Sequence, residues 1–261
     1  MNQKIDRSIT TPEKVESRIG TLEFTDGMPS QDTLDKVYDH LDFTHAFEAF
    51  MNALQGVSMH ALHQGFREAG VKDNEVLIHS ELLDAKSVFL TANADTVYTG
   101  GFLDLTSGPM VLETPPRFLG AMNDYWFRWV IDLGGPGPAR GLGGKNLILP
   151  PGYDGPLPEG GFFIAQAETT YVMWFGRMFL ENDSPEPAVE QSRRFLKIYP
   201  YQAGGAGTSF ATFLRGEVQL GPITPPPEAV FHDLSGQVMN TILPNDYGYY
   251  EMLNEVVQQQ P

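Results

Sequence analysis

The 261-residue sequence contains no cysteine. Disulfide bonds, thiolate zinc sites and cysteine nucleophiles are therefore excluded. Basic residues are also scarce, since 17 lysines and arginines stand against 33 aspartates and glutamates, and the formal net charge is −16. A surface of that sign repels phosphate backbones and acidic membrane faces, which argues against nucleic acid as a partner.

Long apolar runs are missing as well. No run approaches the ~20 residues that a membrane-spanning helix needs. Residues 1–18 are polar and lack the apolar centre of a signal peptide. These absences predict a chain without a membrane span and a cytoplasmic location. What is present, 41% hydrophobic and 19% charged residues, is typical of a globular protein with a sizeable buried core.

Residues 1–72 are expected to form a helical subdomain. The Thr-Pro-Glu sequence at 11–13 has the residue types of a helix start, and Ser30 begins a longer helix in the same way. Apolar residues over 43–54 recur at helical spacing, and a further helix is expected after Gly56. Several helices that each bury one side indicate a subdomain packed on something else.

Residues 73–200 are expected to form an antiparallel β-sandwich, because short β-type runs alternate there with glycine and proline. The clearest predicted strand is 124–132, where aromatic and apolar side chains alternate with a more polar set. A helix is predicted over 184–196. Residues 201–261 are expected to be a connector that ends in a helix over 245–259. The predicted fold class is therefore α+β.

Two patterns are typical of a cofactor or metal site, but each of them is incomplete. The glycine-rich loop 134–144 is followed by Lys145 but lacks the spacing of a phosphate-binding loop, so we interpret it as a turn between strands. His60 and His63 are three residues apart on a predicted helix, yet no third ligand accompanies them. We expect partner-satisfied or solvent-facing histidines, no metal site and no cofactor.

The segment 91–98 carries polar residues just before a predicted strand. In an extended chain Asn93 and Asp95 face one way, while Thr96 and Tyr98 face the other. Such a pair can cap a turn through bonds to the backbone. It can also hold a polar ligand at the rim of a sheet, and both interpretations stay open.

Two arginines have similar alternatives. Arg128 lies on the more polar side of its predicted strand, beside Trp126, whereas Arg177 shares its side with apolar residues. If that side is buried, the Arg177 guanidinium requires a carboxylate. A structural ion pair is one interpretation, and a clamp on a ligand carboxylate is the other. The candidate partners for Arg177 are Asp95, Asp104 and Asp132.

An aromatic platform beside charged groups suits a sugar ring or an aromatic ligand, and Trp126 is the candidate for it. If the chain is an enzyme, an aspartate is the expected base or nucleophile, with Asp95 and Asp132 as candidates. The predicted ligand-binding residues are Asn93, Asp95, Tyr98, Trp126, Arg128, Asp132 and Arg177.

Four motifs together resemble the DUF1254 family, a domain of unknown function. They are T-A-N-A-D-T-V-Y at 91–98, L-D-L at 103–105, the strand end D-L-G at 132–134 and G-G-K-N-L-I-L-P-P-G-Y-D-G at 143–155. The resemblance spans roughly 35–200. It implies an immunoglobulin-like β-sandwich with a helical subdomain and carries no assigned chemistry.

Two further positions extend the resemblance. Arg177 falls where the family usually has an arginine, and the L-P-N-D sequence at 243–246 is similar to the connector that leads into a second domain, DUF1214. That jelly-roll domain is expected to be absent from this chain. Many relatives carry signal peptides and are exported, which differs from the cytoplasmic location expected above.

The sequence supports two function hypotheses. The first is binding of a small molecule or oligomer, sugar-like or aromatic, with carboxylate-based hydrolysis as a further option. The second is a non-catalytic module that docks onto the absent domain or onto a second copy of itself. The C-terminal helix favours the second hypothesis, because its apolar residues need a surface to cover.

Overall fold

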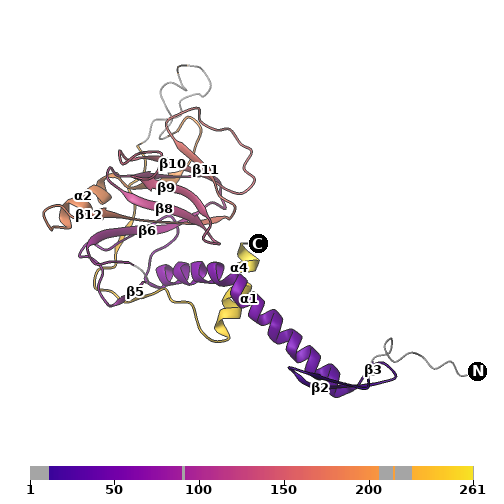
Figure 1. Cartoon of the computed structure of the whole chain (residues 1–261). Coiled ribbons are helices and arrows are strands. Elements are labelled where there is room, and N and C mark those ends of the chain that lie inside the picture. Colours follow the sequence, from indigo (N-terminus) through magenta and orange to yellow (C-terminus); the bar gives the residue numbers. More distant parts are fainter. Residues whose placement is uncertain (1–11, 90–91, 206–213, 215–224, 261) are drawn as a thin grey trace, which may run out of the picture. The chain divides into compact units, whose positions relative to one another are not determined.

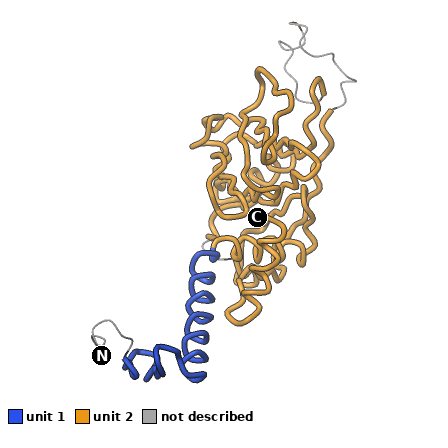
Figure 2. Tube along the Cα trace, turned by 90° about the vertical axis from the view of Figure 1, so that its right-hand side faces the viewer, with its two compact units in different colours: residues 1–54 blue, residues 55–261 orange. Residues whose placement is uncertain are grey.

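The computed structural model divides the chain into two compact units, residues 1–54 and 55–261 (Figure 2). The long helix α1 (Gln31–Glu68) contributes to both units. Helices and sheets occur together, so the predicted α+β class is confirmed. The structure describes residues 12–89, 92–205, 214 and 225–260. Thr11 and Thr91, and residues 206–213 and 215–224 of the predicted connector, lie outside them.

The first unit begins with strands, so the helix expected from residues 11–13 is wrong. A three-stranded sheet precedes α1, and positive φ angles at Gly20 (103°) and Gly27 (83°) allow its turns. The expected helix start at Ser30 is confirmed, because Thr33 N–H donates to Ser30 Oγ at 3.2 Å. The strands are β1 (Lys14–Ser17), β2 (Gly20–Thr25) and β3 (Met28–Pro29).

α1 is one helix where the sequence predicted two. Gly56 lies inside it instead of ending it. A Cβ at Gly56 would lie 2.7 Å from Cζ3 of Trp126, so the glycine makes room for the indole ring. Close approach, and not a break in the helix, explains this glycine.

The second unit contains two larger sheets. Figure 1 labels strands of both, β6, β8, β9 and β12 of one sheet and β10 and β11 of the other. The six-stranded sheet has the order β14 (Phe231–Asp233), β4 (Val76–Ile78), β6 (Thr96–Asp104), β12 (Tyr171–Phe179), β8 (Leu119–Asp124), β9 (Trp129–Gly134). The four-stranded sheet has the order β11 (Phe163–Gln166), β10 (Gly144–Leu149), β7 (Met110–Thr114), β13 (Lys197–Pro200).

The sheets are mixed, whereas the sequence predicted antiparallel ones. β14 pairs with β4 in parallel, as does β11 with β10. A short parallel pair, β5 (Ser87–Val88) and β15 (Met239–Asn240), lies outside the two sheets. Parallel neighbours need a crossover connection of about a dozen residues or more. Residues 150–162 make this connection between β10 and β11, whereas β14 and β4 lie far apart in the sequence, which local patterns do not reveal.

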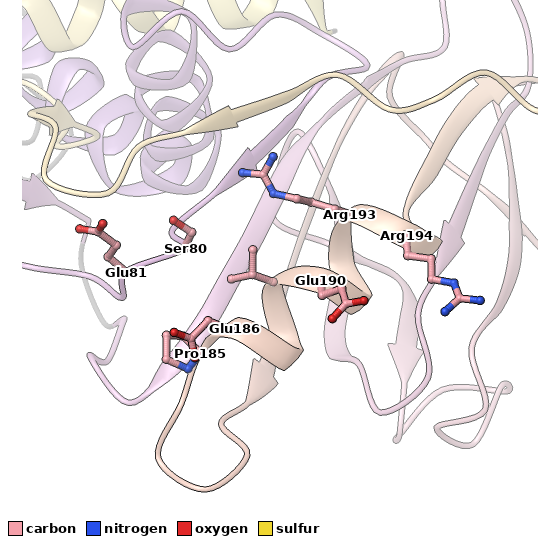
Figure 3. A pocket seen from close by; sticks show the side chains of 8 residues that line it. Ser80, Glu81, Pro185, Glu186, Glu190, Arg193 and Arg194 are labelled. Carbon is pink, nitrogen blue, oxygen red and sulfur yellow. The ribbon is translucent and has the colours of Figure 1, made fainter.

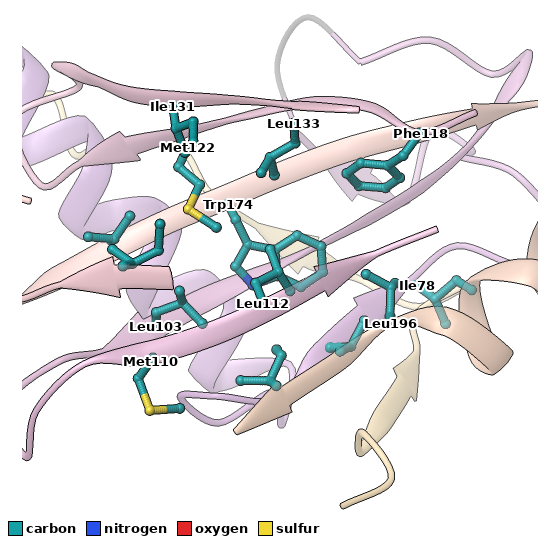
Figure 4. Close-up of a cluster of buried hydrophobic side chains, with 14 of the residues drawn as sticks. Ile78, Leu103, Met110, Leu112, Phe118, Met122, Ile131, Leu133, Trp174 and Leu196 are labelled. Atoms are coloured by element: carbon teal, nitrogen blue, oxygen red, sulfur yellow. The ribbon is translucent and has the colours of Figure 1, made fainter. Parts of the chain in front are cut away.

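One hydrophobic core contains side chains from both larger sheets (Figure 4). Leu103, Met122 and Trp174 come from the six-stranded sheet, and Leu112 and Ile148 from the four-stranded one. The opposite face of the six-stranded sheet is covered too. There a second core gathers residues of the sheet, of α1 and of the C-terminal helix: Met59, Phe66, Phe102, Met173 and Val256.

The strand predicted over 124–132 is wrong. β8 ends at Asp124 and β9 begins at Trp129, with a tight turn between them. Asp124 Oδ1 accepts the backbone N–H groups of Trp126 and Arg128, each at 2.9 Å. Phe127 takes a positive φ of 59°. The aspartate side chain thus directs a turn that the alternating pattern conceals.

The remaining helices agree with the sequence. α2 (Glu186–Phe195) and α4 (Gly248–Gln259) lie within the predicted helical segments. Residues 171–179, within the region where the sequence predicts β-strands, form strand β12. No helix of the described residues has the length and apolarity to cross a bilayer.

Candidate functional site

A cavity of about 570 Å³ lies on the face of the six-stranded sheet that carries the second core. Its volume falls within the range of small-molecule sites. α1, β6, β12 and the segment before α4 all contribute to its wall. The lining residues are Ser58, Leu62, Phe89, Ala92, Tyr98, Phe127, Met173, Phe175, Arg177, Thr241, Ile242 and Leu243.

Stacked aromatic rings form one side of the cavity. Phe175 lies between Phe89 and Tyr98, with ring centroids 4.8 and 5.2 Å away. Gly100 on β6 seats the Phe175 ring, because a Cβ there would lie 2.3 Å from Phe175 Cδ2. The result is an aromatic stretch of the cavity wall, against which an aromatic or aliphatic group can pack.

Arg177 adds a positive charge to this apolar wall. It lies on β12 opposite Tyr98 of β6, and its side chain lines the cavity. The sequence predicted a carboxylate partner if this side were buried. Among the described residues, none of the expected acids, Asp95, Asp104 and Asp132, forms an ion pair with it. The guanidinium is therefore available to a ligand.

The segment before β6 behaves as a turn cap. Asn93 Oδ1 accepts bonds from Thr96 Oγ1 at 2.7 Å and from the Asp95 N–H at 3.3 Å. Asn93 N–H in turn donates to the Tyr98 hydroxyl at 3.3 Å. Asn93 thus supports Tyr98, which lines the cavity, while Asp95 is exposed and does not line it.

Arg128 lies apart from the cavity and forms an ion pair. Its Nε donates to Asp124 Oδ2 at 2.6 Å, and its Nη1 contacts the Glu168 carboxylate. The Asp124 side chain is only 2% exposed. Of the two interpretations of Arg128, the structural ion pair is the one that the contacts favour.

Trp126 is anchored instead of offering an open platform. Its indole Nε1–H donates to the backbone oxygen of Gln260 at 3.1 Å, and its ring covers Gly56. The exposed tryptophan of this region is Trp129, which is 65% exposed at the start of β9. Neither ring lines the cavity.

The two candidate catalytic aspartates are far apart. Asp132 pairs with Ala121, which lies opposite Phe175 and then Gly100 across the sheet. Three strand spacings of about 4.8 Å place Asp132 roughly 14 Å from β6, and Asp95 lies beyond the start of that strand. Glycosidase carboxylates are about 5–9.5 Å apart, so these two do not form such a pair.

A second hollow, of about 760 Å³, runs along α2 (Figure 3). It combines acidic Glu186 and Glu190 with basic Arg193, and Figure 3 shows Arg194 directed away from Ser80. The Ser80 hydroxyl already donates to Asp233, and Arg193 lies 3.8 Å from the same carboxylate. The lining of this hollow carries charges of both signs, Glu81, Glu186 and Glu190 with Arg193 and Arg194, so it does not select a ligand of one charge and the aromatic cavity is the better candidate site.

Sequence reasoning found Tyr98 and Arg177 but missed most of the lining. Phe175 has the same parity as Arg177 along β12, a signal that was present. Ser58 and Leu62 of α1 and the segment 241–243 gave none, because only the tertiary fold brings them to β12. Within the described residues, no group of three or more histidines and acids is placed to hold a metal ion.

Comparisons with known proteins found a family match and a similar crystal structure. No curated protein matches this chain. The crystal structure of the VPA0106 protein from Vibrio parahaemolyticus, a structural-genomics target, is similar at a TM-score of 0.47 and 16% identity. The match covers 81% of this chain and 46% of that one, so this chain spans under half of that protein's length. Residues 74–200 match the model of the family described as "Protein of unknown function (DUF1254)", which confirms the expected resemblance over this part of the chain.

Proposed function

We propose that this protein binds a small organic anion with an aromatic or otherwise apolar body in the cavity beside β12. The observation that carries the proposal is Arg177: a guanidinium with no ion-pair partner among the described residues, set in an aromatic wall. Arginine recognises carboxylates and similar anions with two parallel hydrogen bonds. The ligand's body would lie against Phe175 and its neighbours.

The lining favours an aromatic ligand over a sugar-like one. Sugar sites need several hydrogen-bonding side chains around the ring, whereas this wall offers few. Ser58, Tyr98 and Thr241 carry hydroxyls, but Thr241 Oγ1 already donates to the backbone oxygen of Val88 at 2.9 Å. Tyr98 accepts from Asn93 N–H and keeps its own proton to donate. One cation and one free phenol suit a carboxylate head group.

Two fluorescent probes test the proposal because they differ by one charged group. 8-Anilinonaphthalene-1-sulfonate is an aromatic anion, and N-phenyl-1-naphthylamine is the same ring system without the sulfonate. Loss of a charge-assisted hydrogen bond costs about 1.5–3 kcal/mol, so Arg177→Met is expected to weaken binding of the anionic probe at least about tenfold. The neutral probe should bind both proteins alike.

Arg194→Met is the matched control, since it removes an arginine from α2, outside the cavity. This variant should bind both probes as tightly as the unmodified protein does. Displacement of the anionic probe by simple aromatic carboxylates, but not by their amides, would then define the ligand class. Equal binding of the anionic probe to Arg177→Met and to the unmodified protein would refute the proposal.

The other hypotheses have less support. Hydrolysis by Asp95 and Asp132 would need the two carboxylates together, and they are separated across the sheet. The docking module was suggested by an uncovered C-terminal helix, yet Tyr249 and Val256 of α4 are buried. Docking onto a second domain or a second copy, and the immunoglobulin-like form of the sandwich, stay predictions.

A further inference from the structure

Two buried histidines of α1 share one phenol. His60 Nδ1 lies 2.9 Å from the Tyr125 hydroxyl, and His63 Nδ1 lies 3.0 Å from it. All three residues are at most 2% exposed. None of them lines the cavity described above, so this cluster is separate from the proposed ligand site.

The outer nitrogens of the two rings contact different groups. His63 Nε2 lies 2.6 Å from Asp73 Oδ1. His60 Nε2 lies between two groups, the Glu255 carboxylate of α4 at 2.9 Å and the Gln64 side-chain amide at 3.2 Å. A carboxylate only accepts hydrogen bonds, whereas an amide NH₂ donates them.

Counting protons fixes the tautomers of the neutral pair. The Tyr125 phenol keeps its proton, because burial raises its pKa. That one O–H can donate to only one Nδ1, and the other ring must donate its own Nδ1–H to the phenol oxygen. Two neutral histidines around this phenol are therefore opposite tautomers.

Asp73 decides which tautomer belongs to which ring. His63 must donate from Nε2 to this carboxylate, so its Nδ1 accepts from Tyr125. His60 then carries its proton on Nδ1, and its bare Nε2 accepts from Gln64. In this state Glu255 has no donor from His60, and its half-exposed side chain can turn to water.

We propose that His60 and His63 form a site for a single proton, which adds to Nε2 of His60 and moves that nitrogen from Gln64 to Glu255. The proton comes from solvent, and the charge of the resulting imidazolium is balanced by the Glu255 carboxylate. Every hydrogen bond from Glu255 through Tyr125 to Asp73 then has one donor and one acceptor.

His60 is favoured over His63 by the surrounding charges. Arg67 Nη2 donates to Asp73 at 2.6 Å, so the carboxylate beside His63 is already neutralised and a cation beside it repels a second one. Glu255 has no arginine or lysine partner among the described residues. Burial lowers the pKa of both histidines, so the proton is taken up below the ordinary value of 6.5.

A second proton has no place in the cluster. With both rings charged, two Nδ1–H groups would face the phenol oxygen, and the Tyr125 proton would lose its acceptor. Two buried cations would also lie against one hydroxyl, at high electrostatic cost. The pair therefore takes up one proton over the pH range in which two independent histidines would take up two.

Nitrogen-15 NMR of the imidazole rings tests this directly, because ring shifts report both tautomer and charge. At about pH 8 we expect His60 as the Nδ1–H and His63 as the Nε2–H tautomer. On acidification to about pH 5, His60 becomes an imidazolium while His63 keeps its tautomer. Identical tautomers at the higher pH, charging of both rings, or a His60 that never charges would each overturn the proposal.

Three variants test the site through the titration midpoint of His60, the pH at which half of this ring is charged. Glu255→Gln removes the carboxylate and should lower it by about one pH unit. Gln64→Leu removes the donor to the neutral ring and should raise it. Glu251→Gln, an equal charge change at an exposed position one turn earlier on α4, should leave it unchanged. Equal shifts for Glu251→Gln and Glu255→Gln would reduce the effect to general charge and contradict the site.

Discussion

Arg128 Nε donates to Oδ2 of Asp124 at 2.6 Å, and the same carboxylate accepts two backbone N–H groups through its other oxygen. The acid is buried and the arginine is half-exposed. One buried aspartate thus closes the turn between β8 and β9 and holds the only side-chain cation that contacts it among the described residues.

Arg128→Ala is expected to lower the free energy of unfolding by about 1–3 kcal/mol, because the buried carboxylate loses a charge-assisted hydrogen bond. Binding of the aromatic probes should not change, since Arg128 does not line the cavity. Urea denaturation and probe titration measure the two effects. The reverse result, unchanged stability with lost probe binding, would show that Arg128 contacts the ligand instead.

Gly100→Ala tests the seat of the Phe175 ring. The new Cβ would lie 2.3 Å from Phe175 Cδ2, so the ring must move, and overpacking of this kind costs about 1–3 kcal/mol. We expect lower stability together with weaker binding of both probes. Gly160→Ala is the control, because a Cβ there meets nothing within 4 Å. Similar behaviour of the two variants would show that Gly100 is not required at this position.

Gln260 ties the chain beyond α4 to the β-strand region. Its Oε1 accepts the Thr170 N–H at 2.8 Å, and its Nε2 donates to Thr170 Oγ1 at 2.7 Å. Gln260→Ala should destabilise the protein by about 1–2 kcal/mol. It should also speed hydrogen exchange of the α4 amides. Exposed Gln259→Ala should do neither, and equal effects of both substitutions would argue against the anchor.

Stability should fall as the pH drops below about 6.5, the ordinary pKa of histidine. Burial lowers the pKa of His60, His63 and His79 in the folded state, so the unfolded chain takes up their protons first. Each such group gives a slope of up to about 1.4 kcal/mol per pH unit. Unfolding free energies measured between about pH 8 and pH 5 should therefore decrease.

His79→Leu isolates one part of this slope. The His79 ring is buried and its Nδ1 has no hydrogen-bond partner among the described atoms. Replacing it with an apolar side chain should leave stability at the higher pH nearly unchanged and reduce the loss at the lower pH. Exposed His40→Leu should not alter the slope. An unchanged slope in His79→Leu would show that this ring charges as easily when folded as when unfolded.

Local patterns were sufficient where neighbours in sequence decide the structure. The start at Ser30, helices α2 and α4, and most strands of residues 74–200 followed from capping residues and periodicity. The pattern failed at 124–132, because alternation continues through a turn that the Asp124 side chain imposes. It failed at Gly56 as well, where the reason for a glycine is an indole ring 70 residues away in the chain.

The sequence by itself determined the α+β class, the absence of thiol chemistry, the acidic surface and the placing of Arg177 and Tyr98 as candidates. Only the tertiary structure decided which charges are paired. Whether an arginine is neutralised depends on carboxylates that strand register and packing bring within about 4 Å. The turn between β8 and β9 placed Asp124 beside Arg128, and the packing of the sheet left Arg177 lining a cavity with Phe175 and Tyr98.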